Sequence, residues 1–124
     1  MRFMLLIYSE EGCWAEDERE KCFQESTQIA NALHKEGKFL AASPLLPVSM
    51  ATSVRVRDGK RSLTDGPFAE TREQLGGFFM VEAKDIDEAV EIAARLPAAR
   101  KGTVEVRPVH ELEGLPGRQV GNSK

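Results

Sequence analysis

The chain has 124 residues, of which 41% are apolar and 30% are charged. This composition fits one soluble domain with a modest core, and it excludes a large multidomain enzyme. Lys and Arg number 17 against 20 Asp and Glu, so the net charge of −3 provides no general attraction to nucleic acid or to an anionic membrane. We therefore expect neither as a partner.

The longest strongly apolar run, residues 3–8, is too short for a membrane span or for the apolar core of a signal peptide. A cytoplasmic protein is expected. Cys13 and Cys22 lie nine positions apart, and the chain has two histidines. This pattern predicts neither a disulfide framework nor a zinc site, so we expect no metal and no other cofactor.

In chain order, the unbroken apolar character of residues 2–9 is typical of a central strand covered on both faces. Residues 15–36 combine an acidic first turn with apolar side chains at helical spacing, and they predict a helix that ends at Gly37. Residues 39–43 predict a second strand, and the prolines that follow interrupt it.

A β-hairpin is predicted for residues 53–64, because apolar and polar residues alternate around the turn sequence Asp58-Gly59. A two-residue turn there pairs Val54 with Leu63. The hairpin also carries four basic side chains that could contact phosphate: Arg55, Arg57, Lys60 and Arg61. Because no aromatic side chains lie between them, a solvated edge is the favoured interpretation.

The rest of the chain predicts a strand, a helix and a final strand. Residues 77–83 are apolar enough for a well-buried strand. Asp85 and Glu88 resemble a capping box that begins a second helix, and this helix ends before Pro97. Residues 103–109 alternate as a last strand.

This order of elements predicts an α+β sandwich of the ferredoxin-like type, with both helices on one face of a mostly antiparallel sheet. The strands at residues 3–7 and 78–81 are apolar at every position, so their other face would expose a large apolar patch. We therefore expect a homodimer formed through the sheets, with a barrel-like core. The domain covers residues 1–110, and the Gly- and Pro-containing residues 111–124 are expected to form a mobile tail.

The most unusual segment is residues 65–77, which begins Asp-Gly-Pro-Phe-Ala-Glu-Thr. Its Gly-Pro turn could project Asp65 and Glu70 from a rigid loop at the rim of the sheet. One interpretation is a carboxylate pair for general acid-base catalysis. The other is that Asp65 accepts hydrogen bonds from backbone amides of the turn. Residue type and spacing favour the second, because the sequence shows no accompanying nucleophile or metal-ligand set.

Three other residues have structural interpretations. His34 lies near the end of the first helix, where a cation stabilises the helix, and His110 borders the tail. Neither stands in a pattern typical of a nucleophilic triad. Trp14 is expected to pack the preceding loop onto the first helix.

With these residues considered, the chain resembles the YCII-related superfamily, in the branch named for its DGPF motif. The resemblance covers residues 1 to about 110, and its marks are residues 3–8, 54–59, 65–78, 96–100 and 104–108. It implies a ferredoxin-like fold that dimerises by stacking sheets, with a pocket in each protomer.

The resemblance also bears on which residues could be catalytic. Family members are often encoded beside sigma factors of the extracytoplasmic-function kind, and one relative is a dehydrochlorinase that acts on a chlorinated hydroxyquinol. Other relatives carry a His and Asp pair proposed as catalytic, but alignment on residues 33–37 places Ser26 and Leu96 at those positions. Any catalysis is then expected from Asp65 and Glu70, with four residues lining the pocket: Tyr8, Ser43, Phe68 and Glu73.

Two functions follow. The first is a dimer with a small-molecule pocket, acting as a weak lyase-type enzyme or as a ligand binder. The alternative is a protein-interaction or regulatory module linked to sigma-factor-dependent transcription. A pocket lined by the carboxylates of the loop would favour the first, and a flat surface there would favour the second.

Overall fold

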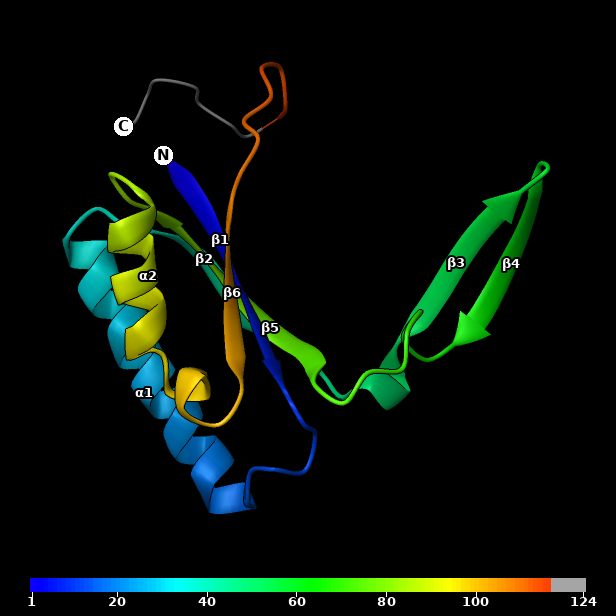
Figure 1. Ribbon diagram of the computed structural model, residues 1–124, viewed down its shortest axis with the longest axis horizontal. Helices are drawn as coiled ribbons and strands as arrows, with labels where there is room; N and C mark the ends of the chain where they lie inside the picture. Colours follow the sequence, from blue (N-terminus) through cyan, green and yellow to red (C-terminus); the bar gives the residue numbers. More distant parts are fainter. Residues whose placement is uncertain (117–124) are drawn as a thin grey trace.

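A computed structural model describes residues 1–116 of the chain (Figure 1). Its elements follow in the order β1 (Arg2–Ser9), α1 (Glu16–Lys35), β2 (Phe39–Pro44), η1 (Val48–Met50), β3 (Thr52–Arg57), β4 (Lys60–Asp65), β5 (Gln74–Glu82), α2 (Ile86–Arg95), η2 (Pro97–Arg100) and β6 (Thr103–Pro108). The predicted order of helices and strands is thus confirmed.

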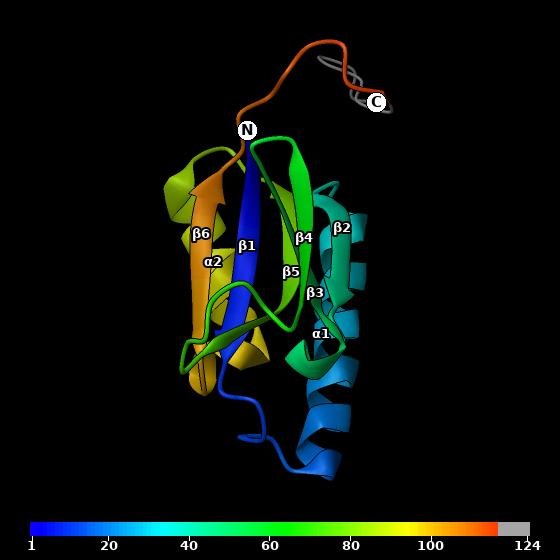
Figure 2. The same cartoon turned by 90° about the vertical axis from the view of Figure 1, so that its right-hand side faces the viewer.

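Four strands form one sheet in the order β2-β5-β1-β6, and every neighbouring pair is antiparallel. Both helices cover the same face of this sheet (Figures 1 and 2). This arrangement is the predicted ferredoxin-like α+β fold, in which each strand-helix-strand unit places its helix on one side of the sheet.

The core lies between the sheet and the helices. Phe3 and Leu5 of β1 and Phe79 and Val81 of β5 are buried against Leu33 of α1 and against a small-residue face of α2. Because side chains alternate along a strand, their neighbours in β1 and β5 point to the face that no helix covers. Met4 and Met80, which are paired across the two strands, lie on that open face.

Strand β5 begins earlier than the sequence predicts. Residues 74–76, which the sequence assigns to the loop, pair with the end of β1: Gln74 lies opposite Ser9 and Leu75 opposite Tyr8. A bulge between Ile7 and Tyr8 shifts the register at this point. The extra pairing carries β5 to the rim of the sheet where the cavity described below opens.

Helix α1 has the predicted limits. The backbone N–H of Ala15 donates to Glu18 Oε1 at 3.0 Å, and Gly37 ends the helix with a φ of +75°. Of its side chains only Leu33, in the last turns, is fully buried. The N-terminal half of α1 therefore does not close onto the sheet.

The hairpin β3–β4 is a separate two-stranded sheet with the predicted register, in which Val54 pairs with Leu63. Asp58 and Gly59 both have positive φ, as the predicted two-residue turn requires. Figures 1 and 2 show the hairpin projecting from the sheet face opposite to the helices. Nearly all of its side chains are exposed.

The second helix has the predicted N-cap, because Asp85 Oδ1 accepts a hydrogen bond from the backbone N–H of Glu88 at 2.9 Å. After β6, the N–H of Val109 donates to the carbonyl of Arg2 at 2.9 Å, and residues 111–116 are exposed. The remainder of the predicted tail, residues 117–124, lies outside the described residues. No helix within residues 1–116 combines the length and the apolar character needed to cross a membrane.

Candidate ligand cavity

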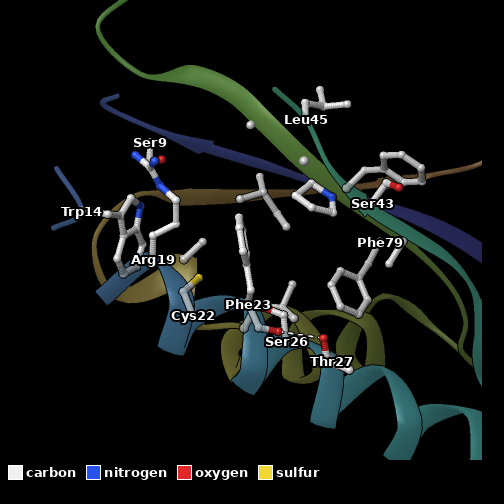
Figure 3. Close-up of a pocket in the computed structure, with 18 of the residues that line it drawn as sticks. Ser9, Trp14, Arg19, Cys22, Phe23, Ser26, Thr27, Ser43, Leu45 and Phe79 are labelled. Carbon is white, nitrogen blue, oxygen red and sulfur yellow. Dashed lines mark hydrogen bonds between the residues drawn. The ribbon is translucent and has the colours of Figure 1, made fainter. Parts of the chain in front are cut away.

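A cavity of about 950 Å³ lies between α1, along its residues 19–34, and the sheet (Figure 3). The ends of β1, β2 and β5, the loop before α1 and the segment after β2 complete its wall. Phe23 of α1 lines the cavity and is 47% exposed, so the cavity is open to solvent. Its place follows from the fold, because α1 is buried against the sheet only near its C-terminal end.

The sheet side of the cavity is apolar. Ile7 and Phe79 line it because they continue the alternation that buries Phe3, Leu5 and Val81 on the helix-covered face. Leu96, at the end of α2, adds a buried aliphatic side chain. These groups favour an apolar, flat molecule over a strongly hydrated one.

The helix side is largely polar. One stripe of α1 faces the cavity at helical spacing, and it consists of Arg19, Cys22, Phe23, Ser26, Thr27, Ala30, Asn31 and His34. The Thr27 hydroxyl donates to the carbonyl of Phe23 at 2.8 Å. Burial raises the pKa of the Cys22 thiol, and a hydrogen bond with Ser26 opposes this effect. Cys22 is thus a neutral thiol at pH 7.

The loop before α1 forms the mouth of the cavity, and its carboxylates have partners. Glu10 Oε2 accepts from Arg72 Nε at 3.1 Å. Glu11 Oε2 accepts from the backbone N–H of Val48 at 2.9 Å. These two contacts tie the loop to the DGPF segment on one side and to η1 on the other.

Lys101 holds the other end of the same loop. Its Nζ lies 4.8 Å from the ring centroid of Trp14, which lines the cavity, and it donates at 3.0 Å to the carbonyl of Cys13 and to the carboxylate of Glu18. The backbone N–H of Ala15 and Lys101 both lower the pKa of Glu18. The Lys101 ammonium group therefore holds Trp14 at the mouth of the cavity, just before the start of α1.

Among residues 1–116, no three His, Cys, Asp or Glu side chains come together as a metal site would need.

The family model of the YCII-related domain matches residues 1–113. The chain belongs to the YCII-related family. An uncharacterized protein of Rhizobium meliloti (strain 1021) is 32% identical over 114 residues, which cover 88% of this chain and 92% of that protein. The predicted superfamily is confirmed, and the assignment to the DGPF branch stays a prediction from the motif.

A solved structure has the same fold. It is the 5-chloro-2-hydroxyhydroquinone dehydrochlorinase of Burkholderia phenoliruptrix AC1100, in complex with 2,5-dihydroxybenzoquinone. The likeness covers 91% of this chain and 97% of that chain, with a TM-score of 0.55 and 15% sequence identity. At this identity the comparison supports the ferredoxin-like fold alone.

The cavity of this YCII-related protein contains one of the six residues predicted for its site. Ser43, at the end of β2, lines the cavity. Tyr8 does not, since it follows the cavity-lining Ile7 in β1 and points to the open face. Glu73 lies outside the cavity wall as well, where its Oε1 accepts from the Thr103 hydroxyl at 2.9 Å.

Three of the predicted site residues, Asp65, Phe68 and Glu70, belong to the segment 65–77 and lie apart from this cavity. Asp65 ends β4 and Glu70 follows in the loop, and both are exposed. Within residues 1–116 the Asp65 carboxylate makes no hydrogen bond, so the predicted cap of the turn is not formed by it. Phe68 is 79% exposed. Their predicted catalytic and binding roles stay predictions.

Two hydrogen bonds to the backbone of Gly66 hold the turn in place. Gly66 has a φ of +103°, which favours glycine, and its N–H donates to the carbonyl of Ala51 at 2.7 Å. The Ser53 hydroxyl donates to the carbonyl of Gly66 at 2.8 Å. The motif therefore joins the base of the hairpin to the strand that follows.

Sequence reasoning missed the cavity stripe on α1, because it interpreted the helical spacing of apolar side chains in residues 15–36 only as a packed face. One signal was available: the same face carries Thr27 and His34, which a packed core would not favour. Ser26 and Leu96, aligned with the His and Asp of other family members, both line the cavity. Both positions thus line the same cavity, although neither residue here has the chemistry of that pair.

Proposed function

We propose that this YCII-related protein binds a small, flat, ring-shaped molecule in the cavity under α1, as a lyase-type enzyme or as a ligand-binding protein. The cavity itself carries the proposal. Its volume of about 950 Å³ lies in the range of small-molecule sites, and an apolar sheet face opposes a hydroxyl-bearing helix face.

The shape of the walls supports a ring. The aromatic side chains of Trp14, Phe23 and Phe79 line the cavity, and aromatic groups favour stacked or edge-on contact with another ring. The Ser26 hydroxyl, on the facing helix, suits an oxygen substituent of the ligand. The solved structure with the same fold holds 2,5-dihydroxybenzoquinone, which is a flat ring with oxygen substituents.

A lyase reaction would also need a base beside the ligand. His34 lines the cavity from α1, and an imidazole can take a proton from a ring substituent as a leaving group departs. Glu10 and Glu11 also line it, but their carboxylates accept hydrogen bonds from Arg72 and from the Val48 amide. His34 is therefore the cavity residue that we propose to examine first for turnover.

A thermal-shift screen with hydroxylated benzoquinones, benzoates and phenols tests the function. We expect compounds that raise the melting temperature of the parent to lose most of this effect in Ser26→Trp, because the indole would project into the cavity and occupy the surface on which a ring would pack. Lys21→Trp is the matched control, since Lys21 is exposed on α1 and lines no part of the cavity. Equal stabilisation of Ser26→Trp, or a screen without any stabilising compound, would contradict the proposal.

We also propose that a second copy covers the open face of the sheet. Met4 and Met80 lie on this face and are only partly buried. The hairpin projects from the same side with Val54 and Val56 each 58% and Leu63 60% exposed. An isolated two-stranded hairpin is at best marginally stable in water, so contact with a second copy would stabilise it.

The distribution of charge along the chain also favours a second copy as the partner. Residues 52–65 contain four of the 17 Lys and Arg and two of the 20 Asp and Glu, so they carry +2 while the rest of the chain carries −5. The hairpin of one copy is thus attracted to the remainder of another. The exposed hairpin and Phe68 also suit the alternative function, a regulatory module that docks a different protein, and the mass in solution separates the two.

A further inference from the structure

We infer that the ligand of the cavity is an anion and that Arg19 of α1 binds its negative group. This inference rests on the proposed small-molecule function and names the class of ligand. Arg19 is the only Lys or Arg within residues 1–116 that lines the cavity. In Figure 3 its side chain extends from α1 toward Ser9 at the end of β1, with Trp14 beside it.

The place of Arg19 in the helix is unfavourable for a cation. The first turn of α1 contains Glu16, Asp17 and Glu18, as the positive end of the helix dipole favours. Arg19 follows directly, and its own N–H makes the first hydrogen bond of the helix, to Ala15 at 2.9 Å. A bound anion beside the Arg19 guanidinium would offset this unfavourable placement through a charge-assisted contact.

The protein itself does not neutralise this charge. No carboxylate within residues 1–116 forms an ion pair with Arg19, whereas the nearby carboxylates have other partners. Glu10 pairs with Arg72 at 3.1 Å, and Glu18 pairs with Lys101 at 3.0 Å. The guanidinium of Arg19 is therefore available to a molecule in the cavity.

The chemistry of these groups defines the ligand. A guanidinium binds a carboxylate, or the ionised oxygens of an enol or phenol, through parallel charge-assisted hydrogen bonds. Trp14 beside it and Phe79 deeper in the cavity provide flat apolar surface. Together they fit an aromatic or quinonoid ring that carries its negative group at the cavity mouth. This position is about 22 Å along α1 from His34, so binding by Arg19 accords with the ligand-binding form of the proposed function rather than with turnover at His34.

Two probes of the same size separate charge from shape: 2-naphthoate, an anion, and 2-naphthamide, its neutral analogue. Titration calorimetry on the full chain should show naphthoate binding at least about tenfold more tightly, as a charge-assisted bond implies. Arg19→Gln should remove this preference and leave the affinity for naphthamide unchanged. Arg19→Lys should keep part of it, and the control Lys21→Gln should keep all of it.

The outcomes separate this inference from the function on which it rests. Equal affinity of the parent for both probes, or an undiminished preference in Arg19→Gln, would overturn the role of Arg19. The cavity would still be supported if Ser26→Trp abolished binding of both probes. If the parent bound neither probe, the proposed aromatic-binding function would fail together with the inference.

Discussion

A Cβ atom on Gly102 would lie 2.0 Å from the carbonyl oxygen of Tyr8 and 2.9 Å from Cβ of Ser9. Gly102 is the turn residue between η2 and β6, and its N–H donates to the carbonyl of Ala98 at 2.7 Å. The backbone therefore passes directly against the end of β1, at the strand end from which the cavity loop departs. Glycine is required here by close approach, since any side chain would collide with backbone.

Gly102→Ala is expected to lower the free energy of unfolding by about 3 kcal/mol or more, because the colliding carbonyl belongs to a paired strand and cannot move alone. Urea unfolding measures the change. Gly76→Ala is the control, since its Cβ would meet nothing closer than 4.0 Å, and its effect should stay within about 1 kcal/mol. Similar free energies of unfolding for Gly102→Ala and Gly76→Ala would show that residue 102 does not lie as close to the end of β1 as described.

The ion pair between β2 and α2 predicts a pH dependence. Lys38 Nζ lies 2.9 Å from Glu88 Oε2, and the Lys84 N–H donates to Glu88 Oε1 at 2.8 Å. These contacts lower the pKa of Glu88, the Lys38 bond most. The ordinary pKa of a Glu carboxyl is about 4.3. Because the pKa of Glu88 is lower in the folded state, its ionised form stabilises the fold at pH values above about 4.3. This contribution is lost as the pH falls through the lowered pKa.

Glu88→Gln should therefore be less stable than the parent at pH 7, and the difference should shrink as the pH falls below about 4. The difference should also shrink in high salt, because the pair is only partly buried. Glu91→Gln is the control on the same helix, since Glu91 is exposed and forms no ion pair with the described residues. A constant difference between Glu88→Gln and the parent from pH 7 to pH 3 would contradict the assigned role.

The proposed dimer predicts a mass of twice 13.7 kDa by light scattering at micromolar concentration. Burial of apolar surface contributes about 25 cal/mol per Å², so an interface of standard size would persist at this concentration. Met80→Glu should give a monomer, because it places a charge on the covered face. Val54→Ser with Leu63→Ser should weaken the dimer, and Ser62→Ala, an uncharged position on the other hairpin face, should change it least. A monomer mass for the parent would reject the dimer.

The DGPF carboxylates can be separated from the cavity by amide substitution. Asp65 and Glu70 are exposed, so Asp65→Asn and Glu70→Gln should change the free energy of unfolding by less than about 0.5 kcal/mol. Both variants should bind a ligand found in the screen as the parent does, because neither residue lines the cavity. If either amide abolished binding or turnover, the predicted catalytic role of the loop would be supported and the cavity would not be the whole site.

Local signals in the sequence were sufficient for the elements and for the hairpin register. The alternation around Asp58-Gly59 pairs Val54 with Leu63, and Gly37 ends the first helix where the structure ends it. Each of these features depends on residues close together in the chain, so turn chemistry and periodicity determine it. The ferredoxin-like order of strands follows from the same elements, because few arrangements bury two helices on one sheet face.

The cavity was decided by the tertiary structure. Helical periodicity shows which side of α1 faces the sheet, and that side is the same whether the helix packs tightly or stands away from the strands. The long-range contacts of α1, with Leu33 in the core near its C-terminal end and Arg100 donating to Glu25 near its middle at 2.9 Å and 3.3 Å, determine the separation. The sequence by itself thus determined the elements and the family, and the long-range packing of α1 decided that Arg19 and Ser26 line a site and that Asp65 and Glu70 lie apart from it.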